Sequence, residues 1–238
     1  MKKLTALSLV LATAAGVQAQ VISWNDSGSV PTTIPSLGVA GVVAATNWNN
    51  SGAGMSLLDI TGAASGASFT ISGSWGTWRT SATSPGQDAN TTYNRNLLNG
   101  YANTSSGIGP EVLAITGIPY PVYNLIVYLS SDTASRTGTI ADSVTATTYD
   151  FTTIGPAAIS GANAVLTQST DTGGLNPSAN YVIFSNVGSS SDTLTLNVPV
   201  GGGISGFQIV AAPEPGVLAL ATCGGFALLA LSRRVVRK

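Results

Sequence analysis

The sequence contains no histidine among its 238 residues. A Ser-His-Asp triad, a histidine general base and histidine metal ligands are therefore excluded. The single cysteine, Cys223, has no second cysteine with which to form an intramolecular disulfide. Residues 20–212 also contain no lysine, which excludes a Schiff-base lysine and a Lys–Asn isopeptide bond there. The stability of this part must therefore come from burial of apolar side chains.

Charged residues make up only 8% of the chain and are divided unevenly along it. Residues 20–212 hold three arginines against eight aspartates and one glutamate, a net charge of −6. The two ends hold six basic residues and one glutamate, a net charge of +5. Because an acidic segment lacks the basic surface that nucleic-acid binding needs, no nucleic-acid partner is expected.

The first 19 residues have the pattern of a secretory signal peptide. A short basic region, Met1 to Lys3, precedes an apolar run over residues 4–16 and small residues that end at Ala19. Signal peptidase is expected to cut between Ala19 and Gln20. The alternative, an uncleaved anchor, is disfavoured because the apolar run is short and a good cleavage site follows it.

The last 26 residues combine a rigid turn, an apolar run and a basic end. Pro213-Glu214-Pro215 precedes the uncharged run 216–231, and Arg233 and Arg234 follow it. A helix over 16 residues would be about 24 Å long, slightly less than the roughly 30 Å hydrocarbon core of a bilayer. The basic end suits a cytoplasmic flank, so we expect a transmembrane helix over 216–231. A buried core helix is the alternative that this length permits.

This order of features resembles the PEP-CTERM sorting signal of bacteria. Pro213, Glu214 and Pro215 match its motif, and Arg233 and Arg234 match its basic end. The resemblance implies cleavage by the membrane enzyme exosortase in organisms that make exopolysaccharide. It divides the chain into a signal peptide (1–19), a body (20–212) and a sorting segment (213–238). The expected location is the inner membrane before cleavage, then the cell surface or the extracellular matrix.

The body has the composition and periodicity of β structure. Residues 123–129 are apolar on both strand faces, which predicts a central strand, and residues 193–198 alternate between apolar and polar. Further strands are expected at 69–71, 112–115, 145–151, 181–184 and 204–210, with turn-forming residues between them. The prediction is an all-β fold, a two-sheet β-sandwich of jelly-roll type flanked by the signal helix and the C-terminal transmembrane helix.

The body also looks like exported bacterial domains with a galactose-binding-like sandwich. The resemblance rests on four segments: Thr116-Gly117-Ile118-Pro119, residues 123–131, residues 180–184 and residues 203–210, with residues 39–50 resembling the N-terminal part. It implies a sandwich fold, and carbohydrate binding is known in that superfamily. A fold does not by itself fix a function, and the resemblance matches no ligand residue in this sequence.

Aromatic residues are the best candidates for ligand binding. Trp48, Trp75, Trp78 and Arg79 could bind a sugar, because aromatic faces stack on sugar rings and polar groups beside them bond hydroxyls. The segment 75–79 reads as a loop. The alternative is that each tryptophan fills the core, which is the interpretation favoured for Trp24.

Neither a catalytic residue, a cofactor nor a metal ion is expected. Asp171-Thr172-Gly173 matches the aspartic-protease triplet, but those enzymes need two copies and the chain has one. Residues 85–95 offer oxygen ligands for Ca²⁺ without the spacing of a known calcium loop, so a structural loop is favoured. The leading prediction is therefore a non-enzymatic surface or exopolysaccharide-matrix protein. A carbohydrate-binding module is the second hypothesis, and a glycoside hydrolase with paired aspartates is the third.

Overall fold

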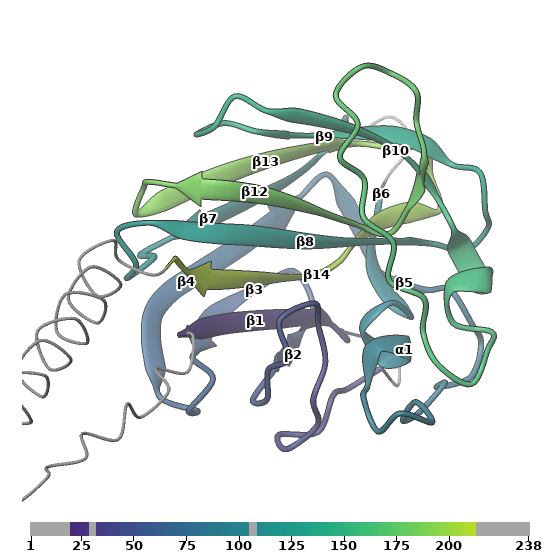
Figure 1. The fold of residues 1–238 in the computed structure, drawn as a ribbon, viewed down its shortest axis with the longest axis horizontal. Helices are drawn as coiled ribbons and strands as arrows, with labels where there is room; N and C mark the ends of the chain where they lie inside the picture. Colours follow the sequence, from purple (N-terminus) through teal and green to yellow (C-terminus); the bar gives the residue numbers. More distant parts are fainter. Residues whose placement is uncertain (1–19, 29–31, 105–108, 213–238) are drawn as a thin grey trace, which may run out of the picture.

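The computed structural model describes residues 20–28, 32–104 and 109–212, which form an all-β, sandwich-like body (Figure 1). The predicted signal peptide 1–19 and the sorting segment 213–238 lie outside the described residues, as do Ala19, Pro213, Glu214, Pro215, Arg233 and Arg234. Within the described ranges, none of the helices has the length and apolarity needed to cross a bilayer.

One layer of the body is a five-stranded sheet. Its strands are β1 (Val21–Asp26), β2 (Asn49–Ser51), β8 (Tyr123–Ser131), β12 (Tyr181–Val187) and β14 (Gly202–Ala211). They lie in the order β12-β8-β14-β1-β2. Neighbouring strands are antiparallel except β1 and β2, which are parallel.

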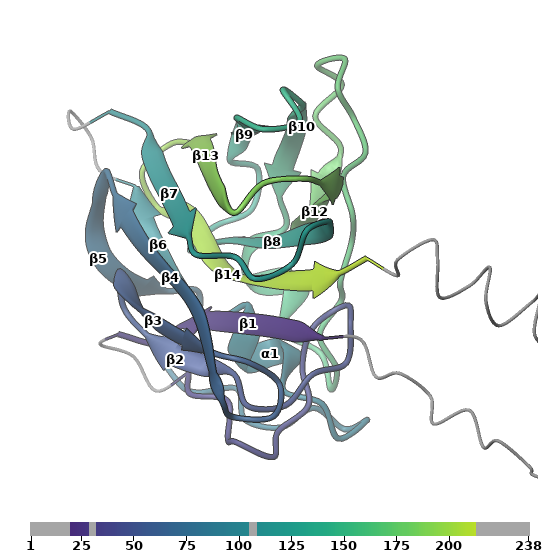
Figure 2. The same cartoon turned by 90° about the vertical axis from the view of Figure 1, so that its left-hand side faces the viewer.

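The second layer is a seven-stranded sheet that curls around one side of the first (Figure 2). Its order is β11-β10-β9-β13-β7-β4-β3, and only β10 and β11 are parallel. The strands are β3 (Gly54–Leu58), β4 (Ala64–Ser72), β7 (Glu111–Thr116), β9 (Thr137–Asp142), β10 (Thr148–Thr153), β11 (Ser178–Ala179) and β13 (Ser191–Asn197).

Three smaller elements complete the described fold. Strands β5 (Ser74–Arg79) and β6 (Gly100–Thr104) form a two-stranded sheet of their own. The helix α1 (Asn94–Leu97) and a 3-10 turn (Gly155–Ala158) are each four residues long.

The segment 75–79 was expected to be a loop, and it is instead the strand β5. The strand assignment follows from its pairing with β6, a contact between segments more than twenty residues apart in sequence.

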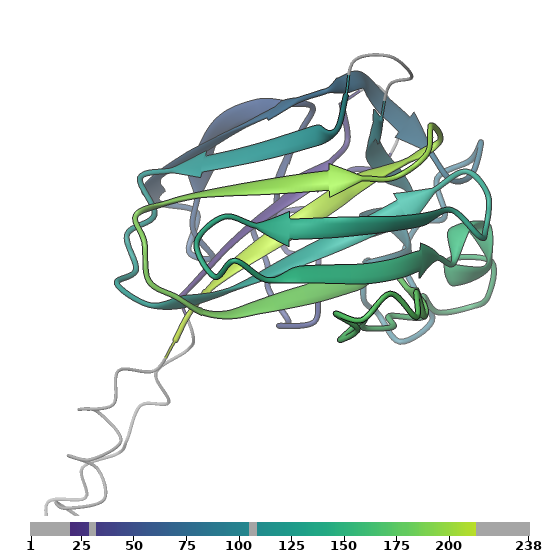
Figure 3. The ribbon, with the colours of Figure 1, turned by 90° about the horizontal axis from the view of Figure 1, so that it is seen from above.

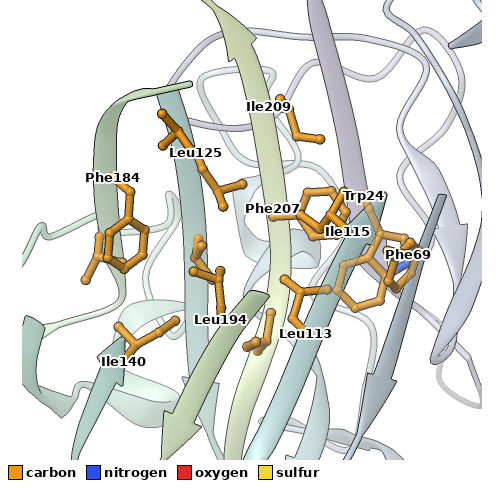
Figure 4. Close-up of a cluster of buried hydrophobic side chains, with 14 of the residues drawn as sticks. Trp24, Phe69, Leu113, Ile115, Leu125, Ile140, Phe184, Leu194, Phe207 and Ile209 are labelled. Carbon is orange, nitrogen blue, oxygen red and sulfur yellow. The ribbon is translucent and has the colours of Figure 1, made fainter. Parts of the chain in front are cut away.

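The main core lies between the two large sheets (Figure 4). Trp24 from β1, Phe69 from β4 and Phe207 from β14 meet there, with ring centroids 4.6, 5.4 and 5.3 Å apart. Each ring is at most 3% exposed. Buried aromatic rings contribute the largest apolar area per residue, so this cluster supplies the burial that a chain without disulfides needs.

A second core covers the outer face of the five-stranded sheet. Residues 34–48, α1 and the 3-10 turn pack there against Ile126 and Tyr128 of β8. The opposite face of β8 presents Tyr123, Leu125 and Val127 to the first core. The prediction of a central strand that is apolar on both faces is therefore confirmed, and the second core is its physical reason.

A buried polar cluster ties the covering segment to the sheet. The hydroxyl of Tyr128 donates to Oε1 of Gln208 over 2.6 Å, and the Nε2 of Gln208 donates to the carbonyl oxygen of Val43 over 2.7 Å. The Val42 N–H in turn donates to the Tyr128 oxygen over 2.6 Å. Because buried polar groups are costly unless they are hydrogen-bonded, this cluster fixes the segment in one position.

The two ends of the described body leave the fold side by side. Val21 of β1 is paired with Val210 of β14, and the Ala211 N–H donates to the Gln20 carbonyl oxygen over 2.9 Å. β14 runs the length of the body toward this end (Figure 3). The strands β5 and β6 lie at its opposite end, on the right in Figure 1.

Candidate functional site

Two tryptophans share one side of the strand β5. In its pairing with β6, Ser74 lies opposite Thr104 and Thr77 lies opposite Ala102, so β5 contains one extra residue between these pairs. This β-bulge is permitted by Gly76, whose φ is 118°. Residues three apart on a regular strand point to opposite faces, and the extra residue brings Trp75 and Trp78 to the same side.

Both side chains are exposed, and both line a pocket of about 470 Å³. Trp75 is 70% exposed and Trp78 is 53% exposed, whereas Trp24 and Trp48 are nearly fully buried. The other lining residues are Gly76, Thr77, Asn103 and Val200. Tryptophan is costly to leave in water, so two exposed rings in one pocket are typical of a binding surface.

Thr77 fastens the pocket floor to the body. Its hydroxyl donates to Oδ1 of Asp26, at the end of β1, over 2.5 Å. Burial raises the pKa of Asp26 to about 6, although the hydrogen bonds from Thr77 and from the Gly28 N–H act to lower it. The contact holds β5 in place between the two tryptophans, so the pocket is built on the rigid sandwich.

A second buried carboxyl group, that of Glu111 at the start of β7, lies at the same end. Its Oε1 accepts the Ile204 N–H over 3.3 Å, and no described residue bonds its Oε2. Burial raises the pKa of Glu111 well above its usual value, the Ile204 N–H opposes this, and Asp26 adds to it. Both carboxyl groups are covered by other residues and do not line the pocket.

The polar wall of the pocket is formed by Asn103 of β6. Its Oδ1 accepts the Gly201 N–H over 3.0 Å, which orients the amide. Gly201 itself lies against an ion pair, because a β carbon there would come within 2.6 Å of Asp132 Oδ1. In that pair, Nη2 of Arg136 is 2.8 Å from Asp132 Oδ1. The ion pair therefore supports the loop that carries Val200.

The structure separates the four residues expected to bind a ligand. Trp75 and Trp78 lie together as described, but Arg79 does not line the pocket. It follows Trp78 on the same strand, so its side chain leaves β5 on the opposite face. Trp48 was expected at the site and is instead buried in the second core, with its ring 6.3 Å from that of Tyr128. Its indole N–H donates to the Ala45 carbonyl oxygen over 3.0 Å, so Trp48 cannot contact a bound ligand.

Two aspartates do come together, at the other end of the body. Asp142 closes β9 and Asp192 lies near the start of β13, and they are only 2% and 3% exposed. Burial raises the pKa of Asp192 to about 7, with hydrogen bonding and charge from Asp142 acting in the same direction. Each carboxyl group of this pair shifts the pKa of the other, as the paired carboxyl groups of glycoside hydrolases do. This pair is buried inside the protein, however, where no sugar reaches it.

The remaining candidate motifs are turns. Asp171 accepts N–H groups of Gly173 and Asn176, so the Asp-Thr-Gly triplet closes its own loop. In the segment 85–95, Asp88 accepts hydrogen bonds from Thr92 and Asn94. No cluster of three or more metal-ligating side chains occurs within residues 20–28, 32–104 and 109–212.

Asn103, Thr77 and Val200 belong to the site and were not identified from the sequence. Val200 and Asn103 are nearly one hundred residues apart and meet only because β14 packs beside β6. Only Thr77 could have been found, since it lies between the two tryptophans. Comparison with protein-family models, with curated proteins and with solved structures yields no match to this chain.

Proposed function

We propose that this chain is an exported, non-enzymatic protein of the cell surface or the exopolysaccharide matrix. The observation that carries the proposal is the adjacency of Gln20 and Ala211, which are hydrogen-bonded to each other. Gln20 is the first residue after the predicted signal peptide, and Ala211 lies two residues before Pro213, where the predicted sorting segment begins. One end of a self-contained sandwich thus carries both predicted processing sites, as expected for a body delivered by removable segments.

The strand order supports a jelly-roll type of sandwich. Eight of its strands fall into two antiparallel groups, β1-β14-β8-β12 and β7-β13-β9-β10. The chain passes repeatedly between the two layers, and its first and last strands are neighbours, as in double Greek-key jelly rolls. The strands β2 to β6 form an insertion between the first two strands of this framework, and they carry the tryptophan pocket.

The proposed partners act on the two ends. Signal peptidase cuts between Ala19 and Gln20, and exosortase acts on the segment that begins at Pro213 while the helix 216–231 holds the protein in the inner membrane. β14 contains ten residues, so the pocket lies about 30 Å from Ala211 at roughly 3.3 Å per residue. An anchored protein would therefore present the tryptophan pocket away from the bilayer.

Intact-mass measurement of the protein recovered from the producing cells tests this proposal. The expected mass lacks residues 1–19 and most of the segment after Pro213, and the protein is expected at the surface or in the matrix. Deleting residues 213–238 should release the body from the membrane without unfolding it. Recovery of the uncut chain from the cytosol would refute the proposal.

A second candidate function is carbohydrate binding. The observation that favours it is the pocket between Trp75 and Trp78, where exposed aromatic faces lie beside the Asn103 amide. This combination is what sugar rings require, since they present apolar faces and hydroxyl edges. In this role the protein would hold exopolysaccharide near the cell that exports it.

A further inference from the structure

We infer that the pocket formed by Trp75, Trp78 and Asn103 binds an uncharged polysaccharide and discriminates against acidic ones. This inference rests on the second candidate function proposed above and defines its ligand class. It depends on three features of the described residues: the aromatic surface, the hydrogen-bonding groups available at the pocket, and the placement of the nearby charges.

The aromatic surface is built for stacking. The bulge at Gly76 turns both indole rings to one side of β5, and the hydrogen bond from Thr77 to Asp26 fixes the strand beneath them. Because the strand is fixed, only the side-chain torsions of the two tryptophans lose freedom when a ligand binds. Pyranose rings offer flat C–H faces of matching size to such a surface.

The hydrogen-bonding groups of the pocket are neutral. The Oδ1 of Asn103 is occupied by the Gly201 N–H, and among the described residues its Nδ2 has no acceptor. That amide can therefore donate to a sugar hydroxyl. The Thr77 hydroxyl is on the face of β5 opposite the tryptophans, where it donates to Asp26 and lies against Gly28, so it does not bond a ligand stacked on the rings. None of the six lining residues carries a charge.

The nearby charges do not favour an anionic sugar. Arg136 is paired with Asp132. Arg79 does not line the pocket, and as the residue after Trp78 on β5 it belongs to the opposite strand face. The third arginine of the body, Arg95, lies 3.6 Å from Asp88 and donates to backbone carbonyl groups away from the pocket. With a net charge of −6 over residues 20–212, the body repels a polyanion, and no cation in the pocket offsets this repulsion.

The test uses the full chain in a polyoxyethylene detergent, which carries no sugar head group. Native gels are cast with a neutral β-glucan, with a neutral galactomannan or with alginate, a polyuronate. We expect at least one neutral polysaccharide to retard the protein, and alginate to have no effect at low salt. Trp75→Ala and Trp78→Ala should each weaken the retardation by about tenfold or more, because each removes one stacking face.

Two further variants separate stacking from a general loss of structure. Trp78→Phe keeps an aromatic face and should retain part of the binding. Arg79→Ala, on the opposite face of the same strand, should bind as the original protein does. Near-ultraviolet circular dichroism of each variant checks that the body is folded.

Several results would overturn the inference. These are alginate bound as tightly as the neutral polymers, retention that survives in the double tryptophan variant, and absence of retention by both neutral polymers. A dimer that dissociates on Trp75→Ala would assign the rings to a protein interface instead. None of these results would affect the export proposal, because intact mass and cell fractionation test that separately.

Discussion

The buried pair Asp142 and Asp192 should make the protein less stable as the pH rises from 4 to 7. Their carboxyl groups interact with each other, and a hydrogen bond between them requires that one holds a proton. Asp192 Oδ2 accepts the Tyr123 hydroxyl over 3.3 Å, and its Oδ1 has no hydrogen-bond partner among the described residues. The change that tests this is Asp192→Asn, because an amide is neutral at every pH and can always donate to Asp142.

The sign follows from the two pKa values. Burial raises the pKa of Asp192 from 3.8 to about 7, so the folded protein holds this proton more tightly than the unfolded chain does. Its stabilising effect is complete below about pH 4 and is lost as the pH rises to about 7. Burial also raises the pKa of Asp142, but hydrogen bonds from Asp192, Thr145 and Val144 outweigh it and leave the pKa lowered. The contribution of Asp142 to the stability of the fold is therefore lost only at acidic pH.

The magnitude is a few kilocalories per mole. A rise of the pKa from 3.8 to about 7 corresponds to at most about 4 kcal/mol, at about 1.4 kcal/mol per unit. The favourable contribution of ionised Asp142 offsets part of this. We therefore expect the free energy of unfolding of Asp192→Asn, relative to that of the original protein, to increase by about 2–3 kcal/mol between pH 4.5 and pH 8.

Urea unfolding, followed by tryptophan fluorescence at both pH values, measures this difference. Asp26 and Glu111 also destabilise the protein at higher pH, so the informative quantity is the difference between variant and original at each pH. Asp59→Asn is the control, because the pKa of Asp59 is lowered by hydrogen bonds from Thr61. The difference in unfolding free energy between this variant and the original protein should be the same at pH 4.5 and pH 8. An Asp192→Asn effect that is the same at pH 4.5 and pH 8 would refute the reasoning.

Three further substitutions test the core, a close backbone approach and a buried acid. Phe207→Ala should lower the unfolding free energy by about 3–5 kcal/mol, measured by urea unfolding, because it removes a fully buried ring. Gly203→Ala should yield insoluble protein, since a β carbon there overlaps the Ala102 carbonyl oxygen, whereas Gly52→Ala, with its nearest neighbour at 3.6 Å, should be recovered normally. Glu111→Gln should raise the urea midpoint more at pH 8 than at pH 4.5, because the raised pKa of this carboxyl means that its ionised form destabilises the fold; equal shifts would contradict this.

Much of the fold could be predicted from local pattern. Alternation in residues 193–198 and the two apolar faces of residues 123–129 identified β13 and β8, and the central position of β8 is confirmed. These predictions succeed because successive side chains of a strand point to opposite faces, so the sequence itself shows whether one face or both are apolar. The strand β5 was missed because its only regularity is interrupted by the bulge at Gly76.

The sequence by itself determined the chemistry that is excluded, the all-β composition and the burial of Trp24. Only the tertiary structure decided which other tryptophans are exposed, because exposure depends on segments distant in sequence. Trp48 is covered by the second core, and Trp78 is not covered by any such layer. The pocket likewise joins Asn103 to Val200, which only the packing of β14 beside β6 brings together. Local pattern records which face of a strand is apolar, but it carries no information about which distant segment will lie against that face.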